Sequence, residues 1–98
     1  MPEVRRQASL PGDHPCLAGH FPDKPVVPAV VMLELVADAA RAAIGSARVT
    51  AVRSAKFLAP LSPSQPMDIH LDWDASAIRF RCEHAGRLLA QGVIEYAL

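Results

Sequence analysis

The sequence predicts an α+β protein in which one long helix is wrapped by an antiparallel β-sheet, as a single domain over residues 1–98. Two observations carry this prediction. One long stretch lacks glycine and proline, and most other segments alternate apolar and polar residues with the period of strands. A sheet that packs one face on a single apolar helix satisfies both patterns. A chain of 98 residues is long enough for about one core.

The predicted helix spans residues 29–44, AVVMLELVADAARAAI. It begins directly after Pro28 and stops at Gly45, which suits a helix C-terminus. Apolar side chains cover most of its circumference. The exceptions form one narrow polar stripe: Glu34, Asp38 and Arg41. A helix that is apolar nearly all round is a buried helix, so we expect Glu34 to lie in largely buried surroundings.

The strands are predicted from their alternation. In residues 67–74, for example, Met67, Ile69 and Leu71 fall on one face and acidic residues and a histidine fall on the other. Proline clusters mark the connections before the helix and near residues 60–66. The predicted strands are residues 3–10, 48–58, 67–74, 78–83 and 87–97.

Composition excludes several classes of protein. Ten basic residues balance ten acidic ones, and 51% of the chain is hydrophobic, which argues against disorder and against nucleic-acid binding. No stretch reaches the roughly twenty apolar residues of a membrane span. With two cysteines, Cys16 and Cys82, and no secretory segment, we expect a soluble, cytoplasmic protein with reduced thiols. So much apolar surface in a small domain favours burial against a second subunit.

Common catalytic motifs are absent from the sequence. There is no GxSxG, no phosphate-binding glycine loop, no GxGxxG, no HExxH and no CxxC. His14, Cys16 and His20 lie close together, but their spacing matches none of the usual zinc patterns. We therefore expect no metal site.

The chemical signal is concentrated in residues 19–34, GHFPDKPVVPAVVMLE. A histidine in a proline-rich loop, His20, precedes a carboxylate on an apolar helix, Glu34. Each has a plain structural interpretation: His20 as a loop residue bonded to backbone, and Glu34 as part of a solvated face with helical ion pairs. The functional interpretation is that a carboxyl in a buried helix is costly to hold without a partner, and that such groups tend to have a raised pKa and serve as proton donors.

This stretch resembles the signature of the 3-hydroxyacyl-acyl carrier protein dehydratases of the hotdog fold, approximately G-H-F-P-x-x-P-x-x-P-G-V followed, after three residues, by Glu. The matching positions are Gly19, His20, Phe21, Pro22, Pro25, Pro28, Val30 and Glu34. The later segment from Lys56 to Pro60, with Pro63, resembles a second turn of the same family. Ser64 and Gln65 stand where that turn usually has Gly-Asp.

The resemblance implies a dehydration without metal or organic cofactor, in which a 3-hydroxyacyl thioester becomes a trans-2-enoyl thioester. It implies His20 as the base and Glu34 as the acid that assists the departing hydroxyl. The thioester oxygen would be held by a backbone N–H at the helix start, that of Ala29. The family has glycine at this position, and the added methyl of Ala29 would crowd substrate or disfavour a special backbone angle.

The resemblance also implies the partners. In such dimers the histidine of one subunit faces the glutamate of the other, so we expect a homodimer or higher homo-oligomer, or a hetero-oligomer with another hotdog protein. An acyl tunnel is expected near Phe21, Val30, Val31 and Leu33. Acyl carrier proteins are acidic, and the candidate basic residues for docking are Arg5, Arg6, Lys24, Arg53 and Lys56.

Two other functions stay open at this point. A hotdog thioesterase would hydrolyse the same class of substrate with a carboxylate and water. A non-catalytic subunit or acyl-binding module would pair with another hotdog chain, an interpretation favoured by Ala29 and the small size. The acyl chain length, the pathway and the choice between carrier protein and coenzyme A cannot be predicted from the sequence.

Overall fold

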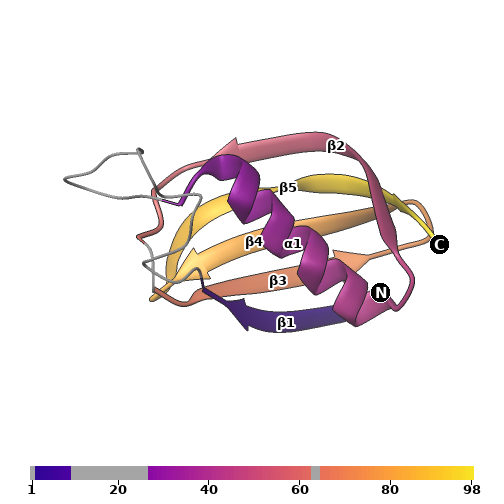
Figure 1. Ribbon diagram of the computed structural model, residues 1–98, viewed down its shortest axis with the longest axis horizontal. Coiled ribbons are helices and arrows are strands. Elements are labelled where there is room, and N and C mark those ends of the chain that lie inside the picture. The colour runs from indigo at the N-terminus through magenta and orange to yellow at the C-terminus, as the bar shows by residue number, and fades with distance from the viewer. Residues whose placement is uncertain (1, 10–26, 63–64) are drawn as a thin grey trace.

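The computed structural model describes residues 2–9, 27–62 and 65–98. In chain order its elements are β1 (Glu3–Ala8), α1 (Ala29–Ile44), β2 (Arg48–Phe57), β3 (Met67–Trp73), β4 (Ala77–His84) and β5 (Arg87–Ala97). The strands form one antiparallel sheet in the order β1-β3-β4-β5-β2, and α1 lies across one face of it (Figure 1). The predicted α+β architecture, with one helix on an antiparallel sheet, is confirmed.

The central strands fold as their alternation predicts. Along β3, Met67, Ile69 and Leu71 are buried, and along β4 the buried positions include Phe80 and Cys82. Leu71 lies directly opposite Phe80 in the β3–β4 register, so apolar side chains of neighbouring strands share the helix-facing side. The intervening polar residues fall on the other face, and a layered core results between α1 and the sheet.

Helix α1 is buried on one side only. Its buried residues are Val31, Met32, Val36, Ala39 and Ala40, which repeat at helical spacing and face the sheet. On the other side Val30 is 62% exposed, and Glu34 is exposed as well. The prediction of a helix buried on nearly all sides is therefore wrong for a single chain, because one five-stranded sheet covers only the side of a helix that faces it.

Strand β2 forms one edge of the sheet and is the least covered strand. It pairs only with β5, and register shifts interrupt the pairing between Val49 and Ala51 and between Val52 and Ser54. Residues 50–58 are all exposed, and the apolar ones among them include Val52 at 49%, Phe57 at 41% and Leu58 at 45%. In Figure 1 nothing lies beyond this strand in the plane of the sheet, so its free backbone groups are open to another strand.

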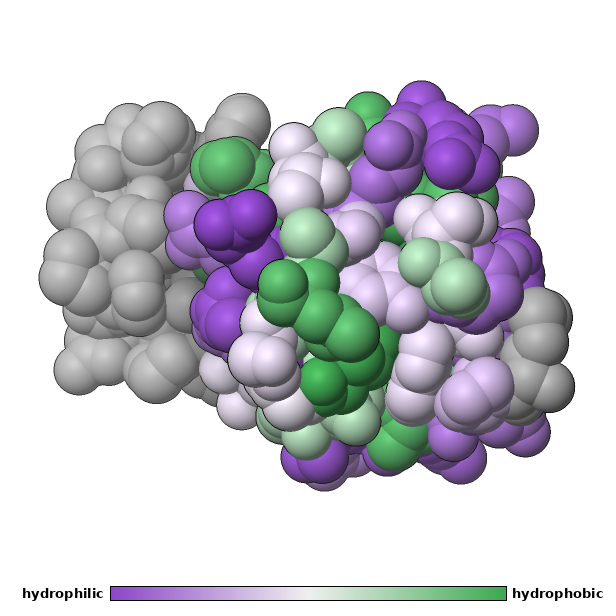
Figure 2. Space-filling view, turned by 90° about the vertical axis from the view of Figure 1, so that its right-hand side faces the viewer, coloured by the Kyte–Doolittle hydropathy of each residue, from purple (hydrophilic) through white to green (hydrophobic). Residues whose placement is uncertain are grey.

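The end of the molecule where the C-terminus lies has a mixed surface. Figure 2 shows hydrophobic residues gathered near the middle of this face, with hydrophilic residues around them.

Over the described residues, no helix has the length and hydropathy that a membrane crossing requires.

Gly92 allows β5 to approach β2 and the core closely. A Cβ built at this position would lie 2.2 Å from the backbone oxygen of Ser54 and 2.8 Å from the Phe80 ring. Neither contact can be relieved by a flexible side-chain end, since one partner is backbone and the other is a buried ring. Glycine is therefore required here by close packing.

We predict that Gly92→Ala destabilises the fold by about 1–3 kcal/mol, because the methyl must displace β2 or the Phe80 ring. Chemical denaturation gives the free energy of unfolding. The control is Gln91→Ala, at the exposed neighbouring position, which should change stability by less than about 0.5 kcal/mol. Equal stability of Gly92→Ala and the wild type would contradict the predicted clash.

Asp74 organises the turn between β3 and β4. Its Oδ1 accepts hydrogen bonds from the Ser76 backbone N–H at 2.8 Å, from the Ser76 hydroxyl at 2.9 Å and from the Ala77 N–H at 3.0 Å. These donors, the Ser76 N–H foremost, lower the pKa of Asp74 from 3.8 to about 2. The charged carboxylate thus favours the folded turn.

We predict that the stabilisation by Asp74 is present above about pH 4 and is lost as the pH falls to about 2, because the pKa is lower in the folded than in the unfolded chain. The measurement is the difference in melting temperature between the wild type and Asp74→Asn at several pH values. The difference should shrink through this window. A difference that stays constant from about pH 5 to about pH 2 would show that the carboxylate charge has no part in the turn.

Candidate functional site

A groove of about 300 Å³ lies where the N-terminus of α1 meets the end of β2. Its walls are largely apolar, which suits an acyl thioester. The lining residues come from α1 and the segment before it, from β2 and from the loop after β2: Val27, Ala29, Met32, Phe57, Leu58, Ala59 and Pro60.

Backbone hydrogen bonds hold the two walls of the groove in place. The N–H of Val27 donates to the carbonyl of Leu61 at 2.8 Å, which ties the entrance to α1 to the loop after β2. The N–H groups of Leu58 and Ala59 donate to the carbonyl of Leu89, at 2.7 and 3.2 Å. Phe57 and Leu58 are thus fixed to β5 although their side chains are exposed.

The start of α1 presents backbone donors at this groove from which no described residue accepts a hydrogen bond. Pro28 is the N-cap in an extended conformation, and its side chain forms no capping hydrogen bond. The Pro28 carbonyl accepts from the N–H of Val31 at 3.0 Å and of Met32 at 3.1 Å. Among the residues that the structure describes, none accepts a hydrogen bond from the N–H of Ala29. This N–H lies at the positive end of the helix, so it is suited to hold a negatively charged oxygen.

Alanine suits the backbone at position 29. Among the described residues other than glycine, only Ala85 has a positive φ, so Ala29 needs no left-handed conformation and carries no such strain. The expectation that alanine at position 29 would disfavour a special backbone angle is therefore wrong. The methyl group remains one of the groove's walls.

Glu34 lies on a different side of α1 from Ala29. Five residues along a helix correspond to about 7.5 Å of rise and about 140° of rotation. Glu34 is exposed, which corrects the expectation of a buried carboxyl, and it forms no ion pair with a described residue. The other members of the polar stripe, Asp38 and Arg41, pair with each other. One chain therefore does not bring its own Glu34 to its own Ala29.

The remaining residues predicted from sequence are scattered. His20 and Phe21 lie outside the described residues. Val30 is exposed on the open side of α1, whereas Val31 is buried in the core and Leu33 packs partly against it. The valines therefore cannot line one common surface within a single chain.

The basic residues considered for carrier docking do not form one patch. Arg5 on β1 pairs with Asp68 at 3.1 Å, and Arg6 donates to the carbonyl of Ala42 near the end of α1 at 3.5 Å. Arg53 and Lys56 lie on β2, and Lys56 directly precedes Phe57 of the groove. Lys24 lies outside the described residues.

Sequence reasoning missed the groove walls formed by Met32, Phe57 and Leu58. The segment from Lys56 to Pro60 was recognised only as a turn motif. Its contact with the start of α1 depends on the pairing of β2 with β5, and these two strands are distant in sequence. The signal available in the sequence was two apolar residues beside a proline, in a segment that resembles a dehydratase motif.

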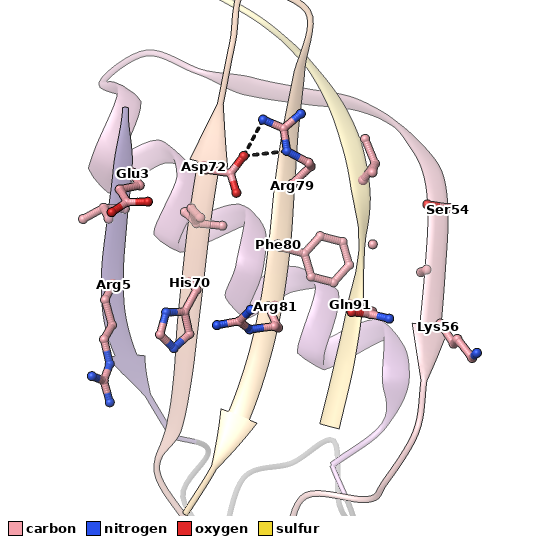
Figure 3. A pocket seen from close by; sticks show the side chains of 15 residues that line it. Glu3, Arg5, Ser54, Lys56, His70, Asp72, Arg79, Phe80, Arg81 and Gln91 are labelled. Carbon is pink, nitrogen blue, oxygen red and sulfur yellow. Dashed lines mark hydrogen bonds and ion pairs between the residues drawn. The ribbon is translucent and has the colours of Figure 1, made fainter. Parts of the chain in front are cut away.

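A larger hollow of about 1020 Å³ lies on the sheet face opposite α1 (Figure 3). Charged side chains line it and form ion pairs. Arg79 of β4 donates to Asp72 of β3 at 2.6 Å, and within β4 Arg81 lies 3.2 Å from Glu83. His70 Nε2 lies 3.3 Å from a Glu83 oxygen without hydrogen-bond alignment. Paired charges of this kind form a solvated sheet face, and an acyl chain needs apolar walls, so the smaller groove is the candidate site.

Metal ligands do not gather in the described part of the chain, where no three His, Cys, Asp or Glu side chains are placed to hold an ion. His14, Cys16 and His20 lie outside it.

The fold and the groove define a protein of the hotdog class. The dehydratase heterocomplex ApeI:P from Xenorhabdus doucetiae matches 98% of this chain and 88% of that chain, with a TM-score of 0.85 at 24% identity. A mutant of the fluoroacetyl-CoA-specific thioesterase FlK matches 98% of this chain and 84% of that chain, with a TM-score of 0.78 at 14% identity. At such identities the likeness shows the fold alone.

The sequence itself shows the family. Residues 2–93 match the ApeI-like family, described as ApeI dehydratase, and the chain belongs to this family. It is also 30% identical over 81 residues to the 3-hydroxyacyl-[acyl-carrier-protein] dehydratase FabZ of Novosphingobium aromaticivorans, a match over 72% of this chain and 51% of that protein. The chain thus spans about half the length of the curated relatives it matches.

Cys82 is no candidate nucleophile. Its side chain is fully buried in β4, and burial raises the pKa of its thiol to about 12. The thiolate is the reactive form, so this cysteine acts as a small core residue.

We predict that iodoacetamide leaves Cys82 unmodified in the folded protein at about pH 8 and modifies it fully in denaturant. Peptide mapping by mass spectrometry distinguishes Cys82 from Cys16. Rapid modification of Cys82 in the native protein would show that its thiol is accessible and would reopen it as a reactive group.

Proposed function

We propose that this protein dehydrates 3-hydroxyacyl thioesters to trans-2-enoyl thioesters at the groove beside α1. His20 takes the proton from C2, and the electron pair of that C–H bond forms the C2–C3 double bond. The C3–O bond breaks, and Glu34 protonates the departing hydroxyl, which leaves as water. Membership of the ApeI dehydratase family supports this reaction.

The observation that carries the proposal is the N–H of Ala29, from which no described residue accepts a hydrogen bond, in an apolar groove. Negative charge builds on the thioester oxygen when C2 loses its proton, and a fixed donor at a helix N-terminus stabilises that charge. The side chains of Phe57 and Leu58 then exclude water on the β2 side of the groove. These groups serve a thioester of any acyl length that fits between the walls.

A second chain completes the site in this proposal. Glu34 and Ala29 of one chain lie on different sides of α1, and the side with Val30 and Glu34 is uncovered. A second hotdog chain that covers this side would bring its own glutamate to the groove of the first. Covering Val30 and the apolar residues of β2 would also remove exposed apolar surface from water.

The relatives support the nature of the substrate and the partner. The name of FabZ states that it acts on acyl chains bound to acyl carrier protein, and the ApeI:P complex is described as a dehydratase heterocomplex. We propose a carrier-bound substrate for this chain on that basis. Assays with the same acyl group on carrier protein and on coenzyme A decide between the two carriers.

Thioester hydrolysis is the competing reaction. It is represented by FlK, a thioesterase with the same fold, but the likeness to FlK lies in the fold alone. Hydrolysis would release a free thiol and a 3-hydroxy acid, whereas dehydration retains the thioester and lowers its mass by one water. Mass spectrometry of carrier-bound 3-hydroxyacyl substrates separates these outcomes.

We predict that His20→Ala and Glu34→Gln each lower the rate of enoyl formation on the order of a hundredfold, because each removes a proton-transfer group. Asp38→Asn is the matched control, since Asp38 is a second exposed carboxylate of α1 and is paired with Arg41. It should retain activity. The assay uses the chain alone and together with any hotdog chain that co-purifies with it.

Two outcomes would overturn the proposal. If neither sample converts 3-hydroxyacyl thioesters of any tested length, the protein is no dehydratase. If the complex is active but His20→Ala is as active as the parent, this chain is a non-catalytic subunit and the reaction belongs to its partner.

A further inference from the structure

The side chain of Ala29 lies next to the place proposed for the thioester oxygen, because that oxygen would bind the backbone N–H of the same residue. Ala29 is exposed and lines the groove where the start of α1 meets the end of β2 (Figure 1). Its methyl carbon is about 2.5 Å from its own nitrogen, and an oxygen that accepts from this nitrogen lies about 2.9 Å from it. A carbonyl held here therefore brings its substituents within van der Waals reach of the methyl group.

The groove runs from a rim at Ala29 to a floor at Met32. Met32 is three residues further along α1, a rise of about 4.5 Å on the same side of the helix, and it is only 3% exposed. A thioester stays joined to its carrier in the solvent, so its acyl chain extends inward, from the N–H of Ala29 toward Met32. In this orientation C2 of the acyl chain lies at the Ala29 methyl group, and the carbons further from the thioester approach Met32.

Neither wall of the groove yields easily beside C2. Alanine has no side-chain rotamers, so the methyl group of Ala29 moves only together with the backbone at the start of α1. The other wall is fixed to β5, because the N–H groups of Leu58 and Ala59 donate to the carbonyl of Leu89 at 2.7 and 3.2 Å. The space between the walls is about 300 Å³, so an extra group on C2 has little room to turn away.

We infer that the methyl group of Ala29 selects acyl chains that are unbranched at C2 and rejects those that carry a methyl group there. A branch at C2 replaces hydrogen by methyl on the carbon that faces Ala29, and such overpacking is destabilising. Branches further along the chain meet Met32 instead, whose flexible side chain adapts to shape. The inference rests on the proposed function, which places the thioester oxygen, and it adds the class of acyl chain that this site accepts.

Two isomeric ligands test the inference without requiring the reaction. They are amide analogues of butyryl-pantetheine and isobutyryl-pantetheine, in which nitrogen replaces the thioester sulfur. Both keep the carbonyl oxygen and contain the same atoms, and they differ in whether the last carbon is attached to C3 or to C2. Without a 3-hydroxyl group they cannot be dehydrated, and the amide resists hydrolysis. Isothermal titration calorimetry measures the Kd of each ligand for the protein as purified, with any hotdog chain that co-purifies.

The variant is Ala29→Gly, which keeps the N–H donor and removes the methyl group. The matched control is Ala59→Gly, which removes the same group from the other wall of the groove. We expect the wild type to bind the butyryl ligand at least about tenfold more tightly than the isobutyryl ligand. Ala29→Gly should lower this ratio to about twofold or less, and Ala59→Gly should keep the wild-type ratio. A general effect of glycine on the start of α1 would weaken both ligands alike and leave the ratio unchanged.

Four results would overturn the inference. They are equal affinities of the two ligands for the wild type, no binding of either ligand to the wild type, a ratio that Ala29→Gly leaves unchanged, and a ratio that Ala59→Gly lowers as much as Ala29→Gly does. The first two need no variant, so they apply even if Ala29→Gly does not fold. Circular dichroism shows whether each variant is folded.

Assays with isomeric substrates separate this inference from the proposed reaction. 3-Hydroxypentanoyl and 2-methyl-3-hydroxybutanoyl thioesters, the latter with all stereoisomers present, can each lose a proton from C2 and the hydroxyl from C3 as water. If the wild type dehydrates neither substrate while the ligands bind with the expected ratio, the proposed reaction is wrong and the selection at C2 stands. If it dehydrates both with equal kcat/KM, the reaction stands and the selection at C2 is wrong.

Discussion

The structure depends on the contact between one helix and one side of a five-stranded sheet. That contact buries Val31, Met32 and Val36 and creates the core. It also leaves the opposite side of an apolar helix, with Val30 and Glu34, facing outward. The sheet also ends at β2, so one helix on one sheet leaves both a side of the helix and a strand edge exposed.

The same geometry separates the chemical groups of the proposed site. A helix N-terminus needs acceptors for its first N–H groups, and in α1 the proline cap supplies no side-chain acceptor. The apolar groove beside Ala29 therefore favours a negatively charged oxygen, although none of its described lining side chains is charged. Glu34, the proposed proton donor, lies about 140° away around the helix. Oxygen stabilisation and proton donation are thus assigned to different surfaces of one short element.

Local sequence patterns predicted the helix and the strands well, because proline, glycine and the alternation of apolar and polar residues set the bounds of these elements. Pro28 and Gly45 bound α1 at the expected residues, and alternation in β3 and β4 placed the buried positions correctly. The extent of helix burial was predicted wrongly, because the composition of a helix does not tell which element covers it. The strand order and the groove walls depend on contacts between distant segments, such as Phe57 opposite Ala90. His20 was found only through its motif and lies outside the described residues.

Gly92 connects the core to the edge in a way that bears on how this sequence can diverge. Because Gly92 has no side chain, the Phe80 ring and the Ser54 carbonyl oxygen can both lie close to the position where a Cβ would be. A smaller residue at position 80 would open room on one side only, since the Ser54 oxygen would still block a Cβ. The core residue and the path of β2 are therefore coupled through a position that bears no side chain of its own. During evolution, homologues that alter the curvature of this edge would have to change both strands and the ring together.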